Sequence, residues 1–76
     1  MQVKIIATRD CNHRPNLERE LNALDIPYQL VFAEDQPDEA QRLGIRHSPN
    51  LVVDGEVVFR RLPSEAELQA YFARRK

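Results

Sequence analysis

The sequence predicts one α/β domain over residues 1–76, with the element order β-α-β-α-β-β-α and a four-stranded mixed sheet covered by helices on both faces. A strand–helix–strand unit in the first half implies a parallel strand pair joined by a right-handed crossover. An Asp-Gly dipeptide between two β-branched runs predicts a tight hairpin, which adds two antiparallel strands. A chain of 76 residues has room for one compact core, so these elements belong to a single domain.

The first half contains two predicted strands separated by one helix. Residues 3–8 form a strand that is apolar on both faces, as is typical of a central strand. Residues 9–14 form a polar loop, and a helix follows from Pro15 to Leu24, where leucines recur at positions i, i+4 and i+7. These residues are Leu17, Leu21 and Leu24. Residues 25–27, Asp-Ile-Pro, end the helix, and residues 28–32 form the second strand.

The second half begins with a short helix and continues as a hairpin. Pro37 suits the first position of the helix, and Gly44 can take the left-handed conformation that closes it. Strands are predicted at residues 50–53 and 56–59, on either side of Asp54-Gly55. This dipeptide favours a type I′ turn, because such a turn needs a positive φ at both central positions.

The last helix is predicted to open with a capping box at residues 64–67, Ser-Glu-Ala-Glu. Its apolar face consists of Leu68, Tyr71 and Phe72. A basic tail complements the negative end of the helix dipole, and it consists of Arg74, Arg75 and Lys76. With a formal net charge of −1, the chain gives no electrostatic sign of a nucleic-acid partner.

Composition and cysteine content point to a cytoplasmic protein that is a monomer or a weak dimer. No apolar run approaches the roughly 20 residues that span a bilayer, so no membrane partner is expected. The N-terminus lacks the pattern of a signal peptide. The single cysteine, Cys11, excludes an internal disulfide, whereas small secreted domains usually carry several.

Three segments resemble small thioredoxin- and glutaredoxin-like proteins. Residues 43–59 look like the family's Gly-Val-x-Ser-x-Pro-x-Leu-Val-Val-Asp-Gly-x-Val-Val stretch, and residues 61–68 are similar to the closing segment of its short redox-active disulfide protein branch. Residues 8–11, Thr-Arg-Asp-Cys, match the place where the family keeps its nucleophilic cysteine. The resemblance covers nearly the whole chain and implies a thioredoxin-like fold.

The resemblance also implies a substrate-binding segment at His47, Ser48 and Pro49. Pro49 would be the family's cis-proline facing Cys11, and the backbone at Ser48 would pair with an extended peptide or glutathione. Cis X-Pro bonds are uncommon in general, so the residues alone leave open a trans proline that only starts a strand. His47 would lie near the cysteine loop.

The catalytic motif departs from the family in one position. Family members usually carry Cys-x-x-Cys here, but this chain reads Cys11-Asn12-His13-Arg14, with Arg14 in place of the resolving cysteine. Cys11 therefore cannot complete an intramolecular dithiol–disulfide cycle. Any mixed disulfide that it forms must be released by an outside thiol, such as glutathione or another protein.

The neighbours of Cys11 have opposing effects on its reactivity. The thiolate is the nucleophile, and Arg9, Arg14 and a protonated His13 would favour it, whereas the adjacent Asp10 would disfavour it. The candidate catalytic residues are accordingly Cys11, His13 and Arg14.

The helix that follows Cys11 is expected to begin too far along the chain for its dipole to favour the thiolate. Its start is compatible with Asn12 as the cap or with Pro15 as the first helical residue, and either choice leaves Cys11 outside the helix. The helix dipole fades over such a distance, so its effect on the thiol is in doubt.

These features favour monothiol thiol–disulfide exchange through Cys11, with no bound cofactor and with glutathione as a candidate co-substrate. The alternative is a thioredoxin-fold binding or adaptor module that uses the same groove without chemistry. A third possibility is a redox component that serves a larger oxidoreductase. A zinc site formed by Cys11, His13 and His47 lacks the usual paired spacing. A standard glutaredoxin is disfavoured, because residues 59–64 lack the Gly-Gly pair that holds glutathione. The iron-sulfur-binding monothiol type is disfavoured as well, because its Cys-Gly-Phe-Ser run is absent.

Overall fold

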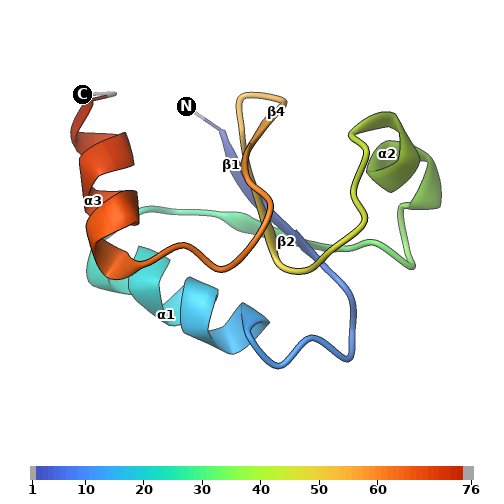
Figure 1. Cartoon of the computed structure of the whole chain (residues 1–76), viewed down its shortest axis with the longest axis horizontal. Helices are drawn as coiled ribbons and strands as arrows, with labels where there is room; N and C mark the ends of the chain where they lie inside the picture. Colours follow the sequence, from blue (N-terminus) through green and yellow to red (C-terminus); the bar gives the residue numbers. More distant parts are fainter. Residues whose placement is uncertain (1, 75–76) are drawn as a thin grey trace.

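The computed structural model describes residues 2–74 and contains the seven predicted elements in the predicted order (Figure 1). They are β1 (Val3–Ala7), α1 (Arg14–Ala23), β2 (Gln29–Phe32), α2 (Pro37–Arg42), β3 (Asn50–Val53), β4 (Glu56–Phe59) and α3 (Glu65–Arg74). Arg75 and Lys76, the end of the predicted basic tail, lie outside the described residues. No helix among residues 2–74 is long and apolar enough to cross a membrane.

The four strands form one mixed sheet in the order β2-β1-β3-β4. β1 pairs in parallel with β2 and antiparallel with β3, and β3 pairs antiparallel with β4. The parallel pair follows from the crossover through α1, and the antiparallel pair at the other edge follows from the tight hairpin. The predicted fold class is confirmed.

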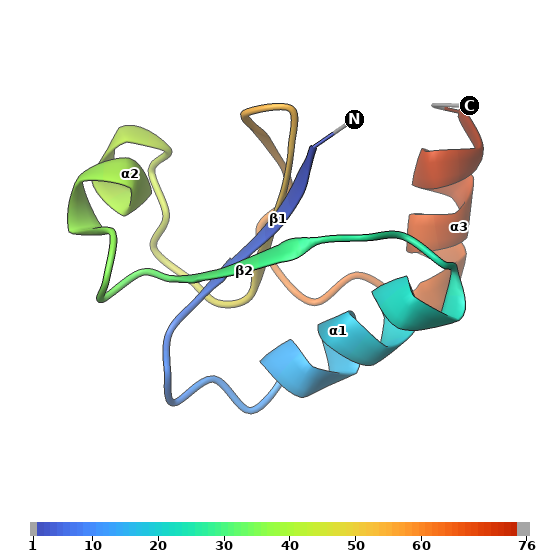
Figure 2. The same cartoon turned by 180° about the vertical axis from the view of Figure 1, so that it is seen from behind.

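Helices α1 and α3 cover one face of the sheet, and α2 lies beyond the other (Figures 1 and 2). The main core lies between the sheet and helices α1 and α3; its buried side chains are Val3, Ile5, Ala7, Leu17, Leu21, Leu51, Val53, Leu68 and Phe72. On the opposite face Ile6 and Val52 are buried, and Lys4 contacts Glu39 of α2 at 3.5 Å. Ala40 is the buried residue of α2.

Four element boundaries differ from the prediction by one residue. β1 ends at Ala7 and β2 begins at Gln29, while α1 both begins and ends one residue earlier, at Arg14 and Ala23. The predicted caps for α1 were wrong, because His13 occupies the N-cap position and its side chain makes no capping hydrogen bond. Pro15 is thus the second residue of α1, where its missing N–H costs no helical hydrogen bond.

The predicted turn between β3 and β4 is confirmed. Asp54 and Gly55 have φ values of 52° and 85°, the two positive angles that a type I′ turn requires. A Cβ atom added to Gly55 would meet nothing within 4 Å. The cost of placing a side chain at this position therefore comes from the backbone conformation alone.

We therefore expect Gly55→Ala to lower the free energy of unfolding by about 1 kcal/mol, because a residue with a Cβ resists the left-handed conformation. Gly55→Asn is the matched control, since asparagine tolerates this region better and should lose less. Urea denaturation of the three proteins measures the difference. An alanine variant as stable as the parent would contradict this explanation of the turn.

The predicted capping box at the start of α3 is also confirmed. The Glu67 amide donates to Ser64 Oγ at 3.1 Å, and the Ser64 amide donates to Glu67 Oε1 at 3.0 Å. Arg61 adds two bonds to the same carboxylate, with Nη1–Oε1 and Nη2–Oε2 distances of 3.1 and 2.6 Å. The bond from Arg61 and those from Ser64 lower the pKa of Glu67 to about 2.

This lowered pKa predicts a specific loss of stability in acid. The contribution of ionised Glu67 is present above the ordinary glutamate pKa of about 4.3 and is lost as the pH falls towards 2. The unfolding free energy of the parent protein should therefore fall more steeply between pH 5 and pH 2 than that of Glu67→Gln. Parallel curves for the two proteins over this range would contradict the prediction.

Candidate functional site

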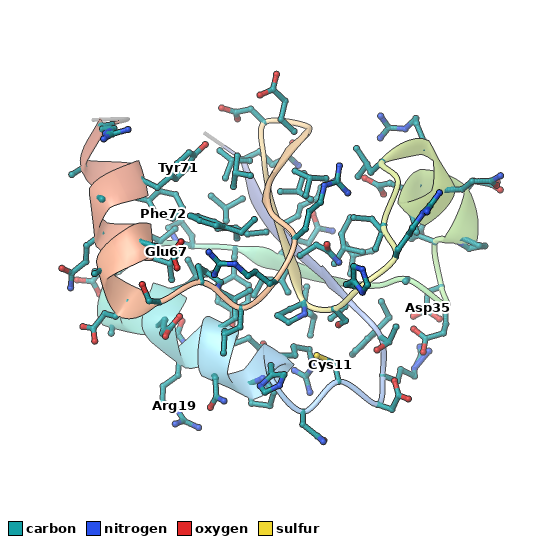
Figure 3. All side chains as sticks on the ribbon, in the orientation of Figure 1. Cys11, Arg19, Asp35, Glu67, Tyr71 and Phe72 are labelled. Carbon is teal, nitrogen blue, oxygen red and sulfur yellow. The ribbon has the colours of Figure 1, made fainter. Side chains whose placement is uncertain are left out.

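The register of the sheet gathers four connecting segments at one edge, the edge formed by the last residues of β1, β2 and β4 and by the first residue of β3. Ala7 at the end of β1 lies opposite Phe32 at the end of β2, and Ile6 lies opposite Asn50 at the start of β3. Phe59 at the end of β4 pairs with Leu51, so β4 also ends at this edge. The segments 8–13, 33–36, 43–49 and 60–64 all start or finish here, and Cys11 lies in the first of them (Figure 3).

Thr8 links the cysteine loop to the proline loop. Its amide donates to the Ser48 hydroxyl at 3.1 Å, and its carbonyl accepts a hydrogen bond from the Cys11 amide at 3.2 Å. Ser48 and Cys11 are 37 positions apart in the sequence, yet two hydrogen bonds through one residue connect them. The structure thus brings together the predicted nucleophile and the predicted substrate-binding segment.

The segment that follows Ser48 is buried and held by Asn50. The Ser48–Pro49 peptide bond is cis, and the Pro49 side chain is fully buried. Asn50 is 0% exposed, and its Nδ2 donates to the carbonyls of Ile6, at 3.2 Å, and His47. Asn50 therefore fastens the loop before Pro49 to the central strand β1.

Cys11 is partly buried and packs against the main core, at a point three positions before the first residue of α1. Its thiol is free, and α1 does not include it. The expectation that Cys11 lies outside the helix is confirmed by these bounds. Access to solvent together with apolar neighbours on one side is compatible with a thiol that a substrate disulfide can reach.

Arg14 is engaged by its own helix. Its guanidinium forms an ion pair with Glu18 one turn later, and the Tyr28 hydroxyl donates to the same carboxylate at 2.9 Å. Burial and the bond to Glu18 raise the pKa of Tyr28 above its ordinary value, so the hydroxyl stays a donor. Because Glu18 compensates the charge of Arg14, less of that charge is left to act on Cys11.

Two guanidinium groups also lie over the Phe32 ring, at the end of β2. The central carbons of Arg9 and Arg14 are 4.8 and 5.7 Å from the ring centroid, within the range of a cation–π interaction. Arg9 pairs with Asp35 at 2.6 Å, so it too has a carboxylate partner. The arginines next to Cys11 are thus built into the surface between β2 and α1.

The two histidines stay at the surface. His13 and His47 are exposed. The His13 carbonyl accepts hydrogen bonds from the amides of Asn16 and Leu17, and the His47 carbonyl accepts one from Asn50 Nδ2. Within residues 2–74, no group of three or more His, Cys, Asp and Glu side chains is arranged to hold a metal ion. The alternative of a zinc site at Cys11, His13 and His47 therefore has no support from the geometry.

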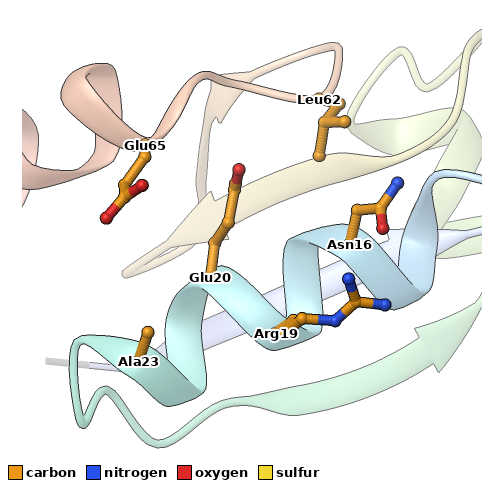
Figure 4. Close-up of a pocket in the computed structure, with 6 residues that line it drawn as sticks. All are labelled: Asn16, Arg19, Glu20, Ala23, Leu62 and Glu65. Carbon is orange, nitrogen blue, oxygen red and sulfur yellow. The ribbon is translucent and has the colours of Figure 1, made fainter.

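A separate hollow of about 350 Å³ lies between α1 and the segment that leads into α3 (Figure 4). Glu20 points from α1 towards this segment, and its Oε2 is buried without a hydrogen-bond partner in the described part of the chain. Burial, and then the charge of Glu65, raise the pKa of Glu20. None of the predicted site residues lines the hollow, so it is distinct from the Cys11 region.

Sequence reasoning missed the residues that connect the site. Thr8 and Asn50 make the joining hydrogen bonds, and Phe32 supports the arginines. The only signal was at Asn50, where a polar residue opens an otherwise apolar strand. Thr8 and Phe32 carried no such signal, because their roles depend on partners far away in the sequence.

Comparison with known proteins identifies the fold. Thioredoxin 1 from the thermophilic eubacterium Thermosipho africanus superposes on this chain with a TM-score of 0.73, covering 99% of this chain and 93% of the thioredoxin. The fold is thioredoxin-like. The two sequences are only 14% identical, so the likeness extends to the fold and not to the activity. No family model and no curated protein matches the sequence.

The candidate site is the edge where the loop that carries Cys11 meets the loop that ends in the cis Ser48–Pro49 bond. Cys11, Ser48 and Pro49 belong to this edge, and Thr8 is the residue that joins its two loops. Arg14 is the first residue of α1, and its guanidinium contacts Glu18 and the Phe32 ring.

Proposed function

We propose that this chain carries out thiol–disulfide exchange through a single nucleophile, Cys11. The observation that supports the proposal is the pair of hydrogen bonds through Thr8, which joins the backbone of the loop that carries half-buried Cys11 to the Ser48 hydroxyl. A thioredoxin-like fold with a cysteine at this place supports redox chemistry as the class of reaction. A reducing, cytoplasmic setting suits a free thiol that has no partner in the chain.

The proposed reaction has two steps that use glutathione as the outside thiol. The Cys11 thiolate attacks the glutathione sulfur of a protein–glutathione mixed disulfide and expels the protein thiolate, which takes up a proton. A second glutathione thiolate then attacks the glutathione sulfur of the Cys11 mixed disulfide. This step releases Cys11 as a thiolate and forms glutathione disulfide, so the substrate cysteine is reduced while the one incoming glutathione is oxidised.

The other named residues have supporting roles in this proposal. The backbone at Ser48, beside buried Pro49, would guide an extended substrate, and His47 would lie along its path. His13 and Arg14 would favour the thiolate, with the effect of Arg14 reduced by its ion pair to Glu18. The protein would act as a monomer or weak dimer, alone or as the redox component of a larger oxidoreductase.

The second candidate function is a binding or adaptor module that uses the same edge without chemistry. The carboxylates that compensate Arg9 and Arg14 favour it, because they leave less positive charge to hold a thiolate. The two candidates make opposite predictions about how the fold changes the reactivity of Cys11.

The test compares the folded protein with a peptide of residues 8–14, which keeps the sequence neighbours of Cys11 but not the fold. Both are incubated with glutathione disulfide at neutral pH, and intact mass follows the gain of one glutathionyl group. The proposal predicts that the protein reacts at least about tenfold faster than the peptide, because an exchange catalyst needs a thiol that the fold makes more reactive than an ordinary one. Equal or slower reaction of the protein would favour the adaptor module, and Cys11→Ser should gain no adduct.

A further inference from the structure

Charges are distributed unevenly along the edge of the sheet that holds Cys11. On the β2 side, Arg9 pairs with Asp35, and its backbone amide donates to Glu34 at 3.0 Å. Beside Cys11 itself, Asp10 is an exposed carboxylate. This side of the edge is therefore balanced or negative.

The β4 side of the same edge carries two arginines without carboxylate partners among the described residues. We call these two, Arg46 and Arg60, together with the neighbouring imidazole of His47, the cationic rim. Arg46 is exposed, and it makes no hydrogen bond or ion pair with any described residue. Arg60 donates to the carbonyls of Gly44, at 3.0 Å, and Leu43, at 3.4 Å. These acceptors are neutral, so the full charge of Arg60 remains uncompensated.

The rim lies next to the proposed substrate path. Arg46 and His47 directly precede Ser48, whose hydroxyl is bonded to the cysteine loop. Arg60 follows the end of β4 and is fastened to the same loop through Gly44. A polypeptide that pairs with the backbone at Ser48 would therefore extend its neighbouring side chains over these three residues.

We propose that the cationic rim selects polypeptide substrates with acidic side chains close to the reacting cysteine. The inference rests on the proposed function and names its substrate class. Opposite charges on the rim and the substrate attract, whereas Asp10 repels an acidic substrate that approaches from the β2 side. Two arginines on a chain of net charge −1 are few for nucleic acid, which is held by many phosphate contacts.

The test measures binding separately from chemistry, with labelled peptides that contain serine in place of the reacting cysteine. One peptide has three glutamates beside the serine, and its matched control has three glutamines. Fluorescence anisotropy at low salt should show that the acidic peptide binds about fivefold more tightly, the scale of a few exposed ion pairs. This preference should shrink as salt rises, because salt screens exposed charges.

Two charge-reversal variants locate the effect. Arg46→Glu should abolish the preference for the acidic peptide, whereas Arg19→Glu, an equal change at an exposed site on α1, should keep it. Equal binding of the two peptides, or a preference that survives Arg46→Glu, would overturn the proposal. Tighter binding of an oligonucleotide of equal charge, lost in Arg46→Glu, would overturn it in favour of nucleic acid.

The outcomes separate this inference from the proposed function. Faster reaction of the folded protein with glutathione disulfide, together with equal binding of both peptides, would remove only the acidic preference. A preference that depends on Arg46, together with no gain in Cys11 reactivity, would support the role of the cationic rim in binding acidic peptides. The proposed exchange reaction would then be rejected in favour of an adaptor module that binds such peptides.

Discussion

Asn50→Asp is expected to lower the free energy of unfolding by about 3 kcal/mol at neutral pH. Asn50 is fully buried, and its amide nitrogen donates to the carbonyls of Ile6 and His47. An aspartate there would lose both donors and direct a charged oxygen at a carbonyl without any cation to compensate it. Urea denaturation monitored by circular dichroism measures the loss.

The pH dependence distinguishes this cause from general damage to the core. Burial disfavours the charged form, so an introduced aspartate has a higher pKa in the folded state than in the unfolded state. The destabilisation is then complete above the folded-state pKa and shrinks as the pH falls towards the unfolded value of about 4. Asn50→Ala is the control, and its loss should not vary in this way. A loss below about 1 kcal/mol for Asn50→Asp would contradict the role given to Asn50.

Arg14→Cys is expected to turn the monothiol into a dithiol that forms an internal disulfide. Residue 14 occupies the place of the resolving cysteine in the Cys-x-x-Cys motif, and in this structure it opens α1 three positions after Cys11. After oxidation, intact mass should show the loss of two hydrogens and no alkylatable thiol. A glutathione adduct at Cys11 should now be short-lived, because the introduced thiol attacks it from within the chain.

Arg14→Ser is the matched control, since it removes the ion pair with Glu18 without adding a thiol. Both variants should lose about 1 kcal/mol of stability, as expected for a partly exposed pair within one helix turn. Arg14→Ser should keep a stable glutathione adduct. If oxidised Arg14→Cys retains two alkylatable thiols, residue 14 is not placed to act as a resolving cysteine, and the prediction is wrong.

The boundaries of the elements with strong local signals could be predicted from the sequence to the exact residue. β3 and β4 were correct at both ends, because the Asp54-Gly55 turn determines where each strand can stop. The start of α3 was also correct, because a capping box is formed within four residues. The start of α1 was wrong by one residue, and there His13 caps the helix without a side-chain bond, so no local signal existed.

The candidate site was predictable only where the family resemblance reached it. Cys11, Ser48 and Pro49 were named from that resemblance, and the structure places their segments at one edge of the sheet. The bond between Thr8 and Ser48 joins residues 40 positions apart, so no local pattern could indicate it. The pair of Arg14 and Glu18 lies at the i, i+4 spacing of a helix, a local pattern from which such a pair can be predicted.

The most direct test of the central claim is turnover of a glutathionylated peptide in excess reduced glutathione, with glutathione disulfide followed through glutathione reductase. Turnover is more decisive than adduct formation, because any exposed thiol can form an adduct once. The account predicts a rate that rises linearly with protein, saturates with peptide and disappears in Cys11→Ser. If the parent protein and Cys11→Ser both leave the uncatalysed rate unchanged, Cys11 is not an exchange catalyst and the account is contradicted.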